Sequence, residues 1–68
     1  MGWTAKDLLR ILKRHGWTVV RIKGSHHILI KEGFPRPVVV PVHGNTDIGS
    51  FADDILKQAG IDPAEERK

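Results

Sequence analysis

The segment GSHH, residues 24–27, contains two adjacent histidines, His26 and His27. Histidine changes charge near neutral pH and its ring nitrogens bind metal ions, so the pair could transfer protons or hold a metal. Neighbouring side chains on a strand point to opposite faces, so one ion cannot easily take both histidines. His43 could join His26, but no carboxylate or cysteine arrangement completes a ligand set. We therefore expect no metal site and no cofactor.

The two histidines stand where two predicted strands meet. Residues 17–23 and 26–32 are rich in β-branched side chains, which favour strands. Gly24 and Ser25 lie at the junction, and glycine followed by another residue suits a two-residue type II′ turn. We therefore assign Gly24 and Ser25 to a hairpin turn and give Ser25 no nucleophilic role.

This hairpin predicts that His26 shares one face of the sheet with two cations. A two-residue loop pairs Lys23 with His26 and Arg21 with Ile28, and paired side chains lie on the same face. Lys23 and Arg21 are poor core residues, so that face should be open to solvent. The residues expected to turn toward the core are Val20, Ile22, His27 and Leu29.

The same register leaves Ile28 and Ile30 on the open face beside the cations. Hydrophobic alternation alone would instead turn both isoleucines inward, together with His26. We give the hairpin more weight, because a register slip would turn the whole strand over. Exposed apolar side chains in this position predict a surface that another molecule covers.

The surroundings of His26 suit chemistry on RNA. Lys23 and Arg21 can bind phosphate, and both favour the neutral form of the imidazole. A neutral imidazole beside an RNA phosphate can take a proton from the ribose 2′-hydroxyl. For His27, packing in the core is the simpler interpretation.

Charge is concentrated in the first half of the chain. Residues 1–36 contain eight Lys and Arg against two acids, a net charge of +6, whereas residues 37–68 carry a net charge of −3. A basic half on a small domain favours a polyanionic partner such as nucleic acid. Outside the hairpin, the cations that could extend a phosphate track are Lys6, Arg10 and Lys13.

Two helices are predicted to flank the strands. Thr4 and Asp7 form a capping-box pair, an apolar stripe follows (Ala5, Leu8, Leu9 and Leu12, with Ile11 beside them), and Gly16 ends the helix. The second helix repeats this pattern, with Ser50 as cap and Gly60 as its end. Its apolar face is expected to hold Phe51, Ile55 and Ala59. Beyond it, residues 62–68 begin one more turn or a frayed tail.

The order of elements is α-β-β-β-α, with residues 37–42 as the third strand. Pro37 and Pro41 favour an edge position for this strand, because proline cannot donate to a ladder. We predict an α+β fold, a three-stranded antiparallel sheet with two helices on one face. The expected organisation is a single domain at residues 1–61 and a short extension at 62–68.

Length and composition limit the remaining possibilities. The chain has 68 residues and no cysteine, so one small core without disulfides or thiolate chemistry is expected. No apolar run approaches a membrane span or the apolar core of a signal peptide, so we expect a cytoplasmic protein.

Four stretches, LLRILKRHGW, RIKGSHHI, VVVPVHGN and ILKQAGI, together resemble the HicA-type (YcfA-like) mRNA interferase toxins over nearly the whole chain. The resemblance implies a double-stranded-RNA-binding-domain-like fold, metal-independent cleavage of mRNA, and neutralisation by a cognate HicB-type antitoxin. It also implies that His26, the histidine of the G-S-H motif, is catalytic, with Gly24, Ser25 and His27 as the rest of the motif.

One stretch differs from the family. Its members usually have a Lys/Pro-Gly-Thr run and a basic helix start, where this chain has TDIGSFADDI. The acids suit the helix dipole but give this helix no means of binding phosphate. Two other classes therefore stay open beside a ribonuclease, a non-catalytic RNA-binding module and a domain that binds only protein.

Overall fold

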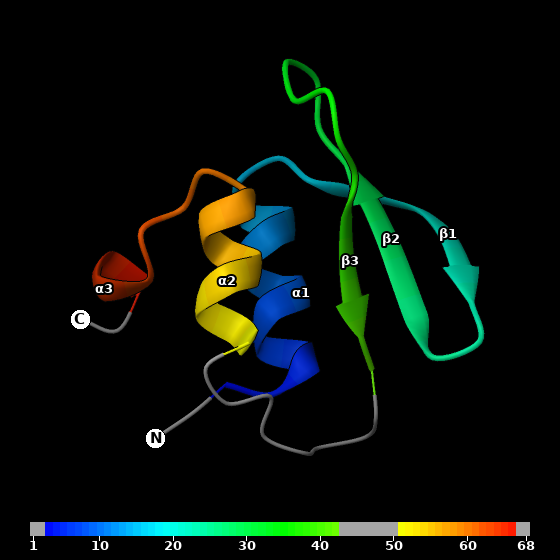
Figure 1. The fold of residues 1–68 in the computed structure, drawn as a ribbon, viewed down its shortest axis with the longest axis horizontal. Helices are drawn as coiled ribbons and strands as arrows, with labels where there is room; N and C mark the ends of the chain where they lie inside the picture. Colours follow the sequence, from blue (N-terminus) through cyan, green and yellow to red (C-terminus); the bar gives the residue numbers. More distant parts are fainter. Residues whose placement is uncertain (1–2, 43–50, 67–68) are drawn as a thin grey trace.

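The computed structural model describes residues 3–42 and 51–66 (Figure 1). The elements are α1 (Ala5–Arg14), β1 (Thr18–Lys23), β2 (His26–Ile30), β3 (Val38–Pro41), α2 (Phe51–Gln58) and α3 (Pro63–Glu66). The strands form one antiparallel sheet in the order β1-β2-β3, and α1 and α2 pack on each other and on β3. The predicted α+β fold is confirmed, as is the edge position of the proline-containing strand.

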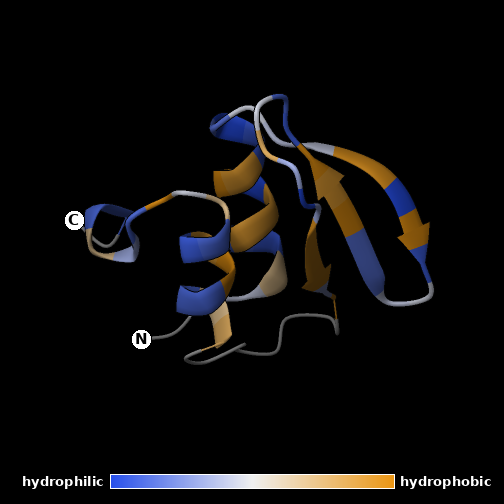
Figure 2. Ribbon diagram, turned by 45° about the horizontal axis from the view of Figure 1, so that its top comes forward, coloured by the Kyte–Doolittle hydropathy of each residue, from blue (hydrophilic) through white to orange (hydrophobic). Residues whose placement is uncertain are grey.

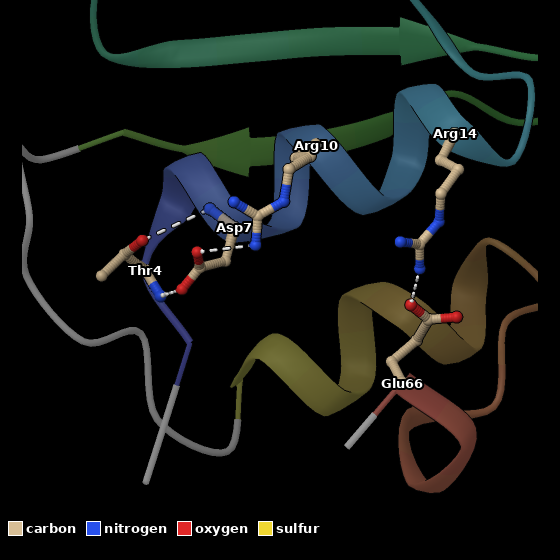
Figure 3. Close-up of polar contacts among 5 residues, drawn as sticks. All are labelled: Thr4, Asp7, Arg10, Arg14 and Glu66. Atoms are coloured by element: carbon tan, nitrogen blue, oxygen red, sulfur yellow. Dashed lines mark hydrogen bonds and ion pairs between the residues drawn. The ribbon is translucent and has the colours of Figure 1, made fainter. Parts of the chain in front are cut away.

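Helix α1 begins with the predicted capping box (Figure 3). The amide of Asp7 donates to Thr4 Oγ1 at 3.3 Å, and the amide of Thr4 donates to Asp7 Oδ2 at 3.1 Å. Two amides that lack a partner within the helix are satisfied in this way. The cap predicted for the second helix, Ser50, and the candidate ligand His43 lie outside the described residues.

Helices α1 and α2 end with the same geometry. Gly16 and Gly60 adopt positive φ angles of 96° and 74°, where a side chain would be strained. The amide of the next residue, Trp17 or Ile61, then donates to a carbonyl of the last helical turn at 2.9 Å. This turn directs both side chains into the core, where Trp17 is 2% and Ile61 5% exposed.

The core forms between the two helices and the strands nearest to them. Its buried residues are Ala5, Leu8, Ile11, Leu12, Trp17, Leu29, Val38, Val40, Ala52, Ile55, Leu56, Ala59 and Ile61. Leu9 is only half-buried. In α2 the predicted apolar face is partly wrong, because Phe51 is exposed while Ala52 and Leu56 are buried. Phe51 stands in the first turn of α2, and the buried side of that turn is formed by Ala52.

Strand β1 projects beyond the helices. The prediction that Val20 and Ile22 enter the core is wrong, since their exposed fractions are 52% and 59%. Figures 1 and 2 show β1 on the far side of the sheet from α1 and α2, so its apolar side chains have no helix above them. A bulge between Val19 and Arg21 also takes Val20 out of the regular alternation.

The loop between β2 and β3 folds back onto the helix ends. Phe34 packs on Trp17, with ring centroids 5.0 Å apart, and Lys31 Nζ lies 5.5 Å from the centroid of the Phe34 ring. A Cβ atom at Gly60 would come within 3.0 Å of the Phe34 ring. Gly60 is therefore required twice, for its backbone angle and for this close contact.

The overhang of β1 predicts a contrast between two apolar residues of the hairpin. Leu29→Ala should lower the free energy of unfolding by about 2–5 kcal/mol, because it leaves a cavity in the core. Ile22→Ala, in the neighbouring strand, should change it by less than about 0.5 kcal/mol, because the side chain is already in water. Urea unfolding of both variants measures the difference, and equal losses would show that β1 is covered in solution.

Candidate nucleic-acid interface

The hairpin register agrees with the prediction from the turn. Lys23 pairs with His26 and Arg21 pairs with Ile28. Gly24 has a φ of 61°, and among the described residues no side-chain-bearing residue, Ser25 included, has a positive φ. Positive φ at the first turn position alone is the signature of type II′, so the predicted turn type is confirmed.

His26 stands in solvent with both cations of β1. His26, Lys23 and Arg21 are all exposed, and the pairing places them on the face of the sheet opposite the core. The turn is held to the neighbouring strand as well, because the amide of Val42 donates to the carbonyl of Ser25 at 2.6 Å. A rigid turn therefore carries the histidine, while nothing in the described structure covers it.

An apolar patch lies on the same open face. Ile30 and Val39 are 47% and 40% exposed, and Val39 pairs with the half-buried Ile28. The isoleucines were predicted here from the hairpin register. Val39 was not, because three successive valines in β3 give no alternation from which to read a face. Its pairing with Ile28 is what decides its side.

His27 points the other way. It pairs with Ile22 on one side and with the buried Val40 on the other, so it lies on the face that the helices cover. Its side chain is half-buried, and Nδ1 is buried with no hydrogen-bond partner in the described part of the chain. The prediction that His27 faces the core is confirmed, although its packing is incomplete because Ile22 beside it is exposed.

The cations of α1 are exposed but belong to the helix layer. Lys6, Arg10 and Lys13 all lie on the solvent side of α1. Arg10 donates to Asp7 at 3.3 Å, and its side chain is 73% exposed, so this pair contributes little to stability. The first turn of α1 and the β1–β2 turn lie at the same end of the molecule (Figure 1). A strand of RNA that contacted both groups would have to pass around that end.

One charged cluster was not predicted from the sequence. Arg14 and His15, at the end of α1, both contact the carboxylate of Glu66 in α3 (Figure 3). The two partners lie 52 and 51 residues apart from Glu66 in sequence, so no local pattern could join them. The run Lys13-Arg14-His15 was the available signal.

Two groups of residues were also searched for other functions. Within residues 3–42 and 51–66, no three His, Asp or Glu side chains are grouped so that they could hold a metal ion. No helix in the same ranges has the length and hydropathy needed to cross a membrane.

An open three-stranded sheet, backed by two helices and exposing a histidine beside two cations, defines a small α+β domain with a basic sheet face. The model of the family described as HicA toxin of bacterial toxin-antitoxin systems matches residues 5–61. The match covers most of the 68 residues, and the chain belongs to the HicA toxin family. Among curated proteins, none matches the sequence.

The geometry of the turn predicts that Gly24 is needed to hold the site together. Gly24→Ala should destabilise the protein by about 1–2 kcal/mol, because a side chain at positive φ meets the following carbonyl. Ser25→Ala is the matched control and should be nearly neutral, since Ser25 needs no such angle. Thermal unfolding compares the two, and an unaffected Gly24→Ala protein would rule out the type II′ turn.

Proposed function

We propose that this protein is the toxin of a toxin–antitoxin pair and acts as a metal-independent endoribonuclease on mRNA. The observation that carries the proposal is the hairpin register, which puts His26 on an exposed face with Lys23 and Arg21. Membership in the HicA toxin family supports it. Single-stranded RNA suits an open sheet face, because its bases and backbone are accessible there.

Each side chain has a separate role in the proposed reaction. The neutral imidazole of His26 takes the proton of a ribose 2′-hydroxyl, and the 2′-oxygen attacks the adjacent phosphorus. The bond from phosphorus to the 5′-oxygen breaks, and the departing oxygen takes a proton from water. Lys23 and Arg21 bind the non-bridging oxygens and stabilise the charge that builds up on them. The products are a 2′,3′-cyclic phosphate and a 5′-hydroxyl end.

The same face supports a proposal for how the antitoxin binds. Family membership implies a cognate antitoxin. Ile28, Ile30 and Val39 form an apolar patch directly beside the cations. An acidic HicB-type antitoxin seated there would cover the patch and exclude RNA at once.

The two histidines give the central test of the proposed activity. His26→Ala should lower the RNA cleavage rate by about 10²–10⁴-fold, the usual effect of losing a general base. Its melting temperature should hardly change, because the side chain is exposed. His27→Ala should lower the melting temperature through lost packing and leave the folded fraction active.

Cleavage of a single-stranded RNA and thermal unfolding, measured on both variants, separate the possibilities. A catalytic loss confined to His27→Ala would move the active residue to the other face of the sheet. RNA binding without cleavage by the wild-type protein would make it a non-catalytic RNA-binding module.

The proposed docking of the antitoxin can be tested with two isoleucines on opposite faces of the sheet. Ile30→Lys should weaken antitoxin binding at least tenfold, because it places a hydrated charge in the covered patch. Ile22→Lys introduces the same charge at a similarly exposed position on the other face and should have a much smaller effect. Titration calorimetry with the cognate antitoxin measures both, and equal affinities would place the docking surface elsewhere.

A further inference from the structure

Helix α3 lies beyond the residues matched by the family and is held against the body of the domain. The family match ends at residue 61, and α3 runs from Pro63 to Glu66. Asp62 caps the helix by accepting from the amide of Ala64 at 2.9 Å, and Pro63 is buried. The extension is therefore an ordered turn of helix, and its last described residue is Glu66.

The carboxylate of Glu66 is enclosed by two basic side chains of α1. Its side chain is only 10% exposed, although it stands near the end of the chain. One oxygen accepts from Arg14 Nη2, and the other lies 3.1 Å from His15 Nε2 (Figure 3). Arg14 itself is 63% exposed, so the guanidinium group also faces solvent.

A carboxylate in this position resembles the phosphate group of RNA. Both groups present two oxygens that share one negative charge, and arginine binds either with its planar donors. The site that receives Glu66 can therefore also receive a phosphodiester. We propose that Arg14 and His15 form a phosphodiester-binding site for RNA, which Glu66 occupies when no RNA is bound. This inference rests on the proposed function, since it adds a phosphate contact to the same RNA.

The neighbours of the site favour RNA over an acidic protein as its ligand. Arg10 stands one turn before Arg14 on α1, and Lys13 is adjacent in sequence. Side chains one turn apart have Cβ atoms about 5–6 Å from each other, so an extended polyanion can contact them in succession. A single carboxylate from a partner would engage the end of this row and leave the other cations unused.

Competition with Glu66 should have a modest and measurable effect. Ion pairs with an exposed partner are weak, so removing the carboxylate should raise RNA affinity by about two- to fivefold. It should also steepen the dependence of log K on log salt by about 0.7, the value for one further phosphate contact on a single strand.

The experiment uses the full chain carrying His26→Ala, so that RNA is not cleaved during the measurement. Fluorescence anisotropy with a single-stranded RNA oligonucleotide compares Glu66→Ala with Glu32→Ala. Glu32 is an exposed acid of the β2–β3 loop, so its removal changes the net charge equally. We expect a gain for Glu66→Ala beyond that of Glu32→Ala, and we expect Arg14→Ala to abolish it. Glu66→Gln, which keeps the size of the side chain, replaces Glu66→Ala if the latter fails to fold.

The possible outcomes separate this inference from the proposed function. If RNA binds but Glu66→Ala and Glu32→Ala behave alike, Glu66 is only a clasp for α3 and the inference is overturned. A gain seen for poly-glutamate and not for RNA would also overturn it. If RNA does not bind at all, the proposed function fails, and titration with inorganic phosphate still tests the site. The His15 ring signals should then shift at lower phosphate in Glu66→Ala than in Glu32→Ala, and identical titrations would exclude an anion site.

Discussion

The two-residue turn at Gly24 and Ser25 is the constraint on which the face of every later side chain depends. Because Gly24 adopts a positive φ, the chain can reverse with only two residues between the strands. That loop length fixes Lys23 opposite His26, and the alternation of a strand then assigns each residue of β2 to a face. A loop one residue longer would exchange the positions of His26 and His27.

The small size of the domain explains why the hairpin is so exposed. Two short helices can cover β3 and the inner side of β2, but they do not extend over β1. The apolar residues of β1 therefore stay in solvent, while Leu29 in the middle of the sheet is fully buried. As a result, the basic open face carries its charges on a strand that contributes little to the core. Substitutions there can change binding without removing the packing that holds the fold.

Internal acids limit how much of the positive charge of α1 is free. Asp7 pairs with Arg10 and Glu66 contacts Arg14, so two of the four Lys and Arg residues of α1 already have carboxylate partners. The cations of the hairpin have no such pairing among the described ion pairs. The uneven charge of the sequence thus becomes a basic sheet face that is open and a basic helix that is partly neutralised.

The sequence by itself determined the elements, their ends and the hairpin register. These features depend on neighbours in the chain: Thr4 with Asp7, Gly16 with Trp17, and the Gly24-Ser25 turn. Only the tertiary structure decided which apolar residues are buried, because burial depends on how far the helices extend across the sheet. Ile22 and Leu29 look alike in sequence, yet one is 59% exposed and the other fully buried. The contact of Glu66 with Arg14 and His15 was likewise decided by tertiary packing, since α3 reaches the end of α1 only once the chain has folded.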